Sequence, residues 1–384
     1  MILSIIAITV IIIYLLLIGL LIYGFDKVDH FKLQDLPAKT KFSVVIPFRN
    51  EAENIPQLLA SISRLNYSKS LFEIILVDDE SSDASAAVIK KFLNTKSSKK
   101  DFTQIDNIQI IKNSRTSNSP KKDAITSAIA VSKFNWIITT DADCILPTYW
   151  LDVFDECIQT KKADCIVAPV TYHGKNSFLN RFQILDFLSL QGATIGGFGL
   201  NKPFICNGAN FGYRKSVFNA LEGFDGNTEI ASGDDIFLLE KFIKNATQNV
   251  YYLKTQKAIV TTNPANNVSE LIHQRLRWAA KTSRYTNRFA KAVGIIVLLS
   301  NLICLELIPA VFIGFISLKT ALALIVIKFS IDFLLLFKTS RFFKQETFLL
   351  SYLFSSLIYP FFAVYIASLS LFKSYEWKGR TFKK

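Results

Sequence analysis

The sequence predicts an α/β domain with a mostly parallel sheet, with transmembrane helices on its N-terminal and C-terminal sides. Half of the 384 residues are hydrophobic although a fifth are charged, and the longest apolar runs lie near the two ends of the chain. Between those runs, short segments rich in β-branched residues alternate with segments of helical periodicity. Acidic residues follow several of the expected strands, which is where parallel sheets bind their ligands.

Composition excludes several classes of protein. The apolar content is too high for a disordered chain. Five scattered cysteines do not make a disulfide scaffold and fit a reducing compartment; they are Cys144, Cys157, Cys165, Cys206 and Cys304. The net charge of +13 would suit nucleic acid, but no nucleic-acid-binding motif accompanies it, so we expect no nucleic-acid partner.

The N-terminal run, residues 2–23, carries no charge and is long enough to span a bilayer. A cleaved signal peptide would have a basic start, a shorter apolar core and small residues at the cleavage site. The chain instead begins Met-Ile-Leu-Ser, and charged residues follow the run closely. We therefore expect an uncleaved transmembrane anchor over residues 1–24.

A C-terminal membrane region of two or three spans is expected over residues 292–373. Its apolar runs cover residues 293–315, 318–337 and 348–372. Lys328 and Asp332 interrupt the second run four residues apart, so they either pair on one helical face or reach toward an interface separately. Pro360 breaks the third run, which is either a span or a re-entrant hairpin.

Basic residues predict the orientation of these helices. They cluster in residues 281–291, 338–344 and 374–384, and basic loops favour the cytoplasm. We expect the middle region to be cytoplasmic and residues 374–384 to form a basic cytoplasmic tail. Three full spans would put the tail on the opposite side, so the number of spans stays open.

The middle region, residues 40–290, is the expected α/β domain. Its expected strands cover residues 42–46, 72–77, 108–112 and 136–140, and its expected helices lie near residues 55–62, 84–93 and 124–132. This alternation implies right-handed βαβ units and a mostly parallel sheet. The chain has neither a G-x-G-x-x-G segment nor a P-loop, and no His or Cys cluster with zinc spacing.

Two acidic pairs are candidates for chemistry. Asp141 and Asp143 follow an expected strand, and hard cations such as Mg²⁺ or Mn²⁺ take carboxylate ligands and bridge them to phosphates; the alternative is a solvated turn. Asp234 and Asp235 open an apolar helix after Gly233. An N-cap role would account for Asp234 alone, and Asp235 would then serve as a general base.

A basic and aromatic segment precedes the second apolar run. Residues 273–278 read His-Gln-Arg-Leu-Arg-Trp. Arg275 and Arg277 either bind a diphosphate, because guanidinium groups fork onto phosphate oxygens, or face the membrane interface. Trp278 would then be a ligand contact or a membrane-belt aromatic.

Together these segments resemble the membrane-bound branch of the family 2 glycosyltransferases, whose nucleotide-sugar-binding domain has the GT-A fold. The resemblance is carried, in the family's order, by residues 45–51 (VIPFRNE), 77–83 (VDDESSD), 120–125 (PKKDAI), 140–143 (TDAD), 233–235 (GDD), 274–278 (QRLRW) and 377–380 (WKGR). Two positions depart from the family pattern: Pro120 stands where Gly is common, and Asp234 stands where Glu is common.

The resemblance implies a role for each matched residue. Nucleotide-sugar binding falls to Pro47, Arg49, Glu51, Asp79, Lys121 and Asp141, with Asp79 touching the base. Asp141 and Asp143 would hold Mg²⁺ or Mn²⁺. Asp235 and Asp234 would be the catalytic residues, with Asp235 as the base. The diphosphate or acceptor would be bound by Gln274, Arg275, Arg277 and Trp278.

The implied activity is inverting transfer of a sugar from a nucleotide diphosphate sugar, expected to be a UDP-sugar, to a lipid or lipid-linked acceptor in the bacterial inner membrane. Two alternatives stay open: a processive polysaccharide synthase and a non-catalytic membrane module with a degenerate transferase fold. Residues 178–200, rich in Phe, Leu and Gly, would be either an interfacial helix that admits a lipid acceptor or a buried core helix.

Overall fold

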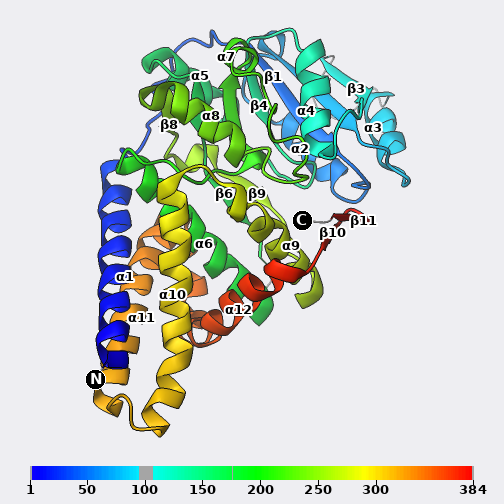
Figure 1. The fold of residues 1–384 in the computed structure, drawn as a ribbon. Coiled ribbons are helices and arrows are strands. Elements are labelled where there is room, and N and C mark those ends of the chain that lie inside the picture. Colours follow the sequence, from blue (N-terminus) through cyan, green and yellow to red (C-terminus); the bar gives the residue numbers. More distant parts are fainter. Residues whose placement is uncertain (1, 95–106, 175, 383–384) are drawn as a thin grey trace. The chain divides into compact units, whose positions relative to one another are not determined.

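A computed structural model describes residues 2–94, 107–174 and 176–382. The chain divides into two compact units, each assembled from segments distant in sequence (Figure 1). The first unit comprises Met1–Val28, Gly174–Ile205 and Pro264–Lys384, and the second comprises Asp29–His173 and Cys206–Asn263.

The second unit is built on a seven-stranded sheet with the order β3-β2-β1-β4-β7-β5-β8. Its strands are β1 (Phe42–Phe48), β2 (Phe72–Asp78), β3 (Ile108–Lys112), β4 (Trp136–Thr139), β5 (Cys165–Val167), β7 (Phe211–Arg214) and β8 (Val250–Tyr252). Only β7 runs antiparallel to its neighbours among these described strands. Strands β6 (Val170–Tyr172) and β9 (Val260–Thr262) form a separate, two-stranded parallel sheet. The mostly parallel sheet predicted from the sequence is confirmed.

Strand β1 is buried along its length because it lies between β2 and β4. It runs two residues beyond the predicted end at Ile46. Pro47 is accommodated because β4 pairs only as far as Val45, so the missing N–H costs no ladder hydrogen bond on that side. The strand therefore delivers Phe48, and the polar residues after it, to the carboxyl edge of the sheet.

Helices of the second unit connect these strands. They are α2 (Ile55–Ser63), α3 (Ser85–Asn94), α4 (Pro120–Val131), α5 (Trp150–Thr160), α7 (Lys215–Ala220) and α8 (Ile236–Ala246), with short 3₁₀ turns at Lys69–Leu71, Gly208–Asn210, Thr247–Asn249 and Gln256–Ala258. Helix α4 begins four residues before the predicted start at 124. Pro120 occupies its first turn, where its fixed φ suits a helix and no N–H is needed. The extra turn brings Lys121 into the helix.

The first unit is helical. It contains α1 (Ile2–Lys27), α6 (Phe178–Gly199), α9 (Val268–Ala280), α10 (Arg288–Phe312), α11 (Leu318–Phe343) and α12 (Tyr352–Phe372), with 3₁₀ turns at Thr282–Arg284 and Glu346–Ser351 and a hairpin of β10 (Tyr375–Trp377) and β11 (Arg380–Phe382). In the described part of the chain, four helical segments are long and apolar enough to cross a bilayer: Ile2–Lys27, Arg288–Phe312, Leu318–Phe343 and Glu346–Phe372. The last continues through Pro360. Apolar helices at both ends of the chain agree with the prediction.

Helix α6 is a mostly buried helix that crosses α1 closely. A Cβ added to Gly199 would lie 2.6 Å from the carbonyl carbon of Gly24, and one on Gly196 would lie 2.9 Å from the Cα of Leu21. These distances are too short for any side chain, so the crossing depends on glycine. Of the two interpretations of residues 178–200, burial within the helical unit is the one that fits.

The ionic residues of α11 pair with each other. Lys328 Nζ lies 2.8 Å from Asp332 Oδ2, and Lys328 is only 2% exposed. The hydroxyl of Tyr14 in α1 donates to the other oxygen of Asp332. Because an unpaired charge is costly among apolar helices, this arrangement holds α1 and α11 together.

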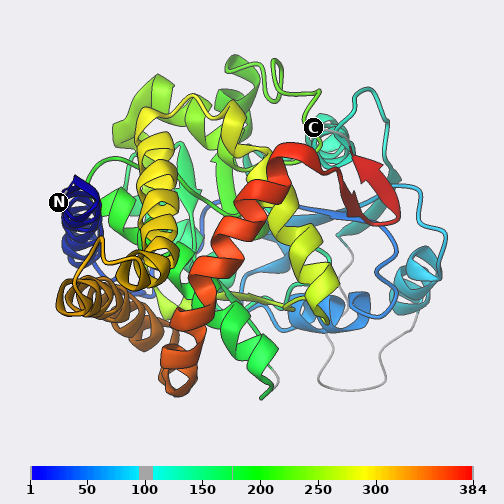
Figure 2. The ribbon, with the colours of Figure 1, turned by 60° about the horizontal axis from the view of Figure 1, so that its bottom comes forward.

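Helix α9, α12 and the C-terminal hairpin form a further cluster, in which the red helix of Figure 2 lies beside the yellow-green one. Leu276, Ile366 and Tyr375 are its buried centre. The backbone N–H of Glu376 donates to His273 Nδ1 at 3.3 Å. The hairpin is thus attached to the helix that carries the QRLRW segment.

Candidate functional site

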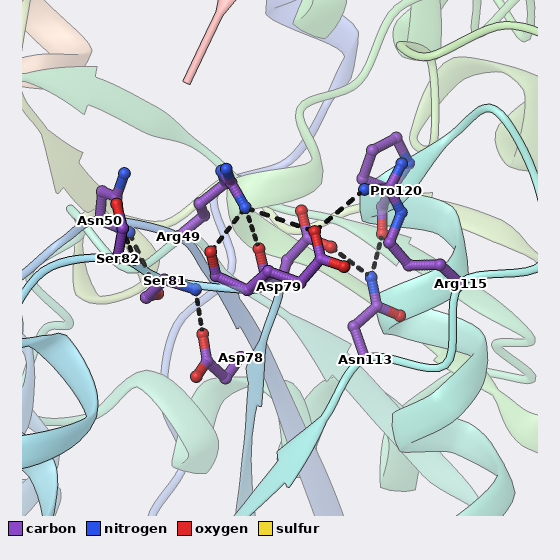
Figure 3. A network of polar contacts seen from close by, with 10 residues as sticks. Arg49, Asn50, Asp78, Asp79, Ser81, Ser82, Asn113, Arg115 and Pro120 are labelled. Atoms are coloured by element: carbon purple, nitrogen blue, oxygen red, sulfur yellow. Dashed lines mark hydrogen bonds and ion pairs between the residues drawn. The ribbon is translucent and has the colours of Figure 1, made fainter. Parts of the chain in front are cut away.

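The loops that follow β1 and β2 are tied together at the carboxyl edge of the sheet (Figure 3). Arg49 Nη1 donates to the carbonyls of Asp79 at 2.6 Å and Glu80 at 2.7 Å. Asn50 Oδ1 accepts from the N–H of Ser82 at 2.8 Å. Asn50 and Glu80 both have positive φ, at 53° and 60°, so each loop turns sharply. Arg49 therefore orders the backbone around Asp79.

Asp79 is nearly buried, at 6% exposure. Asn113 donates its amide N–H to Asp79 Oδ1 at 2.7 Å and to the carbonyl of Pro120 at 3.0 Å. This one amide joins the ends of β2 and β3 to the start of α4. Asn113 was not among the predicted site residues, because an Asn after a strand has no distinctive sequence pattern.

Glu51 contacts other residues of the protein, and Pro47 is part of a strand. Glu51 is 7% exposed, accepts from Asn54 Nδ2 at 2.7 Å, and its N–H donates to Ser85 Oγ at 2.8 Å. Pro47 lies within β1. Both help to set the loop between β1 and α2, and their proposed contact with the nucleotide sugar stays a prediction.

Lys121 joins the two acidic motifs of the second unit. Its Nζ lies 2.6 Å from Asp141 Oδ1 and 3.3 Å from Asp234 Oδ2. Burial of the ammonium group alone would lower the pKa of Lys121, but the charges of Asp141 and Asp234 outweigh it, so the pKa is raised above its ordinary value. Lys121 is therefore a permanent cation between the TDAD and GDD segments.

Asp235 is the N-cap of α8, and not Asp234 as the sequence suggested. Its Oδ1 accepts from the N–H of Ile236 at 2.7 Å, and its Oδ2 accepts from the N–H of Gly208 at 3.3 Å. Asp234 instead faces Lys121. The N-cap geometry holds the Asp235 carboxylate in a fixed orientation at a helix N-terminus, where negative charge is favoured.

The loop at Gly208, which the sequence did not predict as part of the site, lies against Asp234 and Asp235. A Cβ on Gly208 would lie 2.8 Å from Asp234 Oδ2, so a larger residue would collide with the carboxylate. The hydroxyl of Thr139, at the end of β4, donates to the carbonyl of Gly208 at 2.8 Å. The Asn207-Gly208 dipeptide is a turn signal, and it was the only clue that the sequence held.

Asp141 and Asp143 follow β4 and offer the donors that a hard cation prefers. Asp141 keeps 35% of its side chain exposed, and Asp143 Oδ2 accepts from the Thr262 hydroxyl at 3.0 Å. In the described residues no group of three or more His, Cys, Asp or Glu side chains forms a metal cage. A pair of carboxylates nevertheless fits Mg²⁺ or Mn²⁺, which are commonly held by one or two carboxylates together with substrate phosphates.

Cys144 follows this pair but is not suited to nucleophilic chemistry. It is 1% exposed, and burial, reinforced by the charge of Asp143, raises the pKa of the Cys144 thiol well above its ordinary value. It is a packing residue, because only a thiolate would be reactive.

A cavity of about 480 Å³ lies at the ends of β2 and β3 in the second unit. Its lining is polar and carries both signs of charge: Glu80, Arg115, Thr116, Ser117, Asn118 and Glu229. Arg115 Nη1 is 3.3 Å from Glu80 Oε2. Its volume and lining suit a small polar ligand.

The QRLRW segment lies on α9 of the first unit. Arg275 forms a buried ion pair with Asp186 of α6, with Nε and Nη2 at 2.8 and 2.7 Å from Oδ2, and its guanidinium is 4.1 Å from the Trp278 ring. Gln274 Oε1 accepts from Arg275 Nη1. Arg277 stacks over Trp377 of the hairpin at 5.2 Å. Arg275 thus has a buried protein partner, and the proposed ligand contacts of Gln274, Arg275, Arg277 and Trp278 stay predictions.

Comparison with known proteins agrees with this architecture. The chain is 29% identical to the probable glycosyltransferase YdaM of Bacillus subtilis over 50% of its length, covering 44% of that protein. It is 21% identical to the beta-monoglucosyldiacylglycerol synthase of Trichormus variabilis over 66% of its length, covering 52% of that protein. The matches thus span about half the length of these two relatives.

The fold is shared with a solved structure. The mannosyltransferase PcManGT of Pyrobaculum calidifontis, in complex with GDP-Man and Mn²⁺, aligns with a TM-score of 0.57 and 15% identity over 92% of this chain and 99% of that one. This likeness confirms the predicted GT-A fold. The model for glycosyl transferase family 2 matches residues 43–222, and the model for glycosyl transferase family group 2 matches residues 136–372. Because the second model alone covers more than half of the chain, the protein belongs to the family 2 glycosyltransferases.

Proposed function

We propose that the protein is an inverting glycosyltransferase that moves one sugar from a nucleotide diphosphate sugar to a lipid or lipid-linked acceptor. The observation that carries this proposal is the Lys121 bridge between Asp141 and Asp234, with Asp235 next in sequence. This bridge supports a single polar site that would contain both the candidate metal ligands and the candidate base. Lys121 keeps 14% of its side chain exposed between acids from two distant segments, which favours a ligand-binding role over packing.

In the proposed reaction, Asp235 accepts the proton of the acceptor hydroxyl while that oxygen forms its bond to C1 of the sugar. The bond from C1 to the diphosphate breaks at the same time, and its electron pair leaves with the nucleoside diphosphate. The two backbone N–H groups on Asp235 fix the base before the acceptor arrives. Lys121 adds positive charge beside the leaving diphosphate.

Asp141 and Asp143 would hold Mg²⁺ or Mn²⁺, which when bound neutralises negative charge on the diphosphate. The Mn²⁺ in the PcManGT structure supports this assignment. The GDP-Man in that structure shows that a protein of this fold accepts a guanine nucleotide. The preference for a UDP-sugar therefore rests on the sequence resemblance alone.

The membrane lipids supply the acceptor in this proposal. The four helices that are long and apolar enough to cross a bilayer support a membrane location, and a relative is named for a glycolipid product. We propose the bacterial inner membrane, with the second unit in the cytoplasm, where nucleotide sugars are made.

The test uses detergent-purified full-length protein with Mg²⁺ or Mn²⁺ and a panel of UDP- and GDP-sugars, followed by mass spectrometry of added lipid extracts. A lipid that gains one sugar is the expected product. A ladder of polymer would contradict single transfer and favour a processive synthase. Asp235→Asn should lower turnover about 10³-fold, whereas Asp35→Asn, at an exposed position where Asn tolerates the positive φ of 56°, is the matched control. If the wild type consumes no donor, or if the turnover of Asp235→Asn equals that of Asp35→Asn, the proposal is wrong.

A further inference from the structure

Three consecutive charged residues open α4, and only the first belongs to the acidic site. Lys122 is 1% exposed. Its Nζ donates to the carbonyls of Asn227 at 2.6 Å and Ile230 at 2.8 Å, and lies 5.2 Å from the Phe237 ring. A buried ammonium group needs such partners, and here the partners are main-chain atoms of the loop before Asp234. Lys122 therefore holds that loop.

Asp123 holds a different loop. It is 5% exposed and accepts from both the N–H and the hydroxyl of Thr116, each at 3.2 Å. It also accepts from the N–H of Ser117 at 3.0 Å and from its hydroxyl at 2.8 Å. Four donors on one carboxylate, all from residues before the helix, exceed what capping the helix requires.

Both loops line the same cavity. Thr116, Ser117 and Asn118 line the cavity from the loop held by Asp123, and Glu229 lines it from the loop held by Lys122. Asn118 Nδ2 donates to Glu229 Oε2 at 2.7 Å, which joins the loops directly. The first turn of α4 thus carries the anchors of both loops.

We propose that Lys122 and Asp123 are positioning residues that build the binding pocket for the nucleotide part of the donor from these two loops. This inference rests on the proposed function. The cavity adjoins Glu80, next to Asp79 at the end of β2, where an open sheet binds its ligand. Arg115, Asn118 and Glu229 present guanidinium, amide and carboxylate groups, which suit ribose hydroxyls and the polar edge of a base. Lys121 serves the reacting end of the same donor.

Substitution of the two adjacent lysines should therefore change different kinetic constants. Lys122→Met keeps the apolar stem but removes the ammonium group, so the Asn227–Ile230 loop loses its anchor. The Kd for UDP or GDP and the KM for the donor should rise about tenfold while kcat stays within about twofold. Lys121→Met should instead lower kcat. Lys90→Met, at an exposed position of α3, is the matched control.

The experiment measures nucleoside diphosphate binding by calorimetry, steady-state kinetics and Tm for each variant in detergent. A second variant, Asp123→Asn, reaches the pocket through the other loop and should also raise KM, which keeps the test valid if Lys122→Met fails to fold. If either folded variant, Lys122→Met or Asp123→Asn, binds nucleotide as tightly as Lys90→Met does, even with a lower Tm, that residue is merely structural and the inference that both build the pocket is wrong. If the wild type itself binds no nucleotide, the proposed function fails and this inference with it.

Discussion

The crossing of α1 and α6 predicts that a single methyl group will destabilise the helical unit. In Gly199→Ala the new Cβ would lie 2.6 Å from the carbonyl carbon of Gly24. Ordinary contacts begin near 3.4 Å, and the carbonyl oxygen of Gly24 would be nearer still than its carbon, so the helices must separate by about 1 Å or more, or bend. Both atoms in collision are fixed to backbone, so no side-chain rotation relieves the contact, and protein interiors do not absorb such shifts freely.

Overpacking of this kind costs about 1–3 kcal/mol. Alanine's better helix propensity returns up to about 1 kcal/mol, so the net loss should be roughly 1–2 kcal/mol. For a unit of 150–250 residues each kcal/mol lowers Tm by about 2–4 °C, and we expect a decrease of roughly 5 °C. Thermal denaturation followed by size-exclusion chromatography in detergent measures it.

Gly19→Ala is the matched control, because it makes the same substitution on α1 and its Cβ would meet nothing within 4 Å. It should leave Tm unchanged or raise it slightly. A Gly199→Ala protein as stable as Gly19→Ala would refute the close crossing of α1 and α6.

Three further predictions concern charged groups. Lys121→Met should lower kcat roughly 10²-fold. Because the pKa of Lys121 is raised in the folded protein, its ion pairs stabilise the fold fully below the ordinary pKa of 10.5, and this stabilisation is lost only as the pH rises toward the raised pKa. The Tm difference from wild type should therefore stay constant between about pH 6 and pH 9, and a difference that shrinks across that range would contradict the pairing of Lys121 with the two acids. Asp186→Leu alone should cost about 3–5 kcal/mol by leaving Arg275 buried and unpaired, whereas the double variant with Arg275→Met should recover most of that loss in denaturation experiments; equal losses would show that the ion pair is not the cause. Chelation with EDTA should stop turnover and Mn²⁺ or Mg²⁺ should restore it, but not in Asp143→Ala, and full activity in EDTA would exclude the proposed metal.

Local signals in the sequence located strands β1 to β4 and the helices between them, because the causes of these elements are local. Strands β5 to β9 and helices α5 and α7 were not among the predicted elements. The apolar β-branched run at Phe42 and the helical spacing after it predict their own structures. The ends of elements were harder to predict from the sequence. Strand β1 continues through Pro47 because β4 pairs with it only as far as Val45, and that limit is set by the neighbouring strand. The N-cap of α8 is similarly Asp235, since Asp234 is engaged by a lysine more than a hundred residues earlier.

Sequence alone determined the family resemblance, the apolar helices and the acidic residues at strand ends, because motif order and hydrophobic pattern are written along the chain. Tertiary structure decided which of those residues meet. Lys121, Asp141 and Asp234 converge through sheet order, while Arg275 turns to Asp186. The contacts of Lys122 with the Asn227–Ile230 loop and of Asn113 with Asp79 have no pattern in the sequence, because each depends on a partner that only folding brings close. Pairing across long sequence separations is what a one-dimensional pattern does not encode.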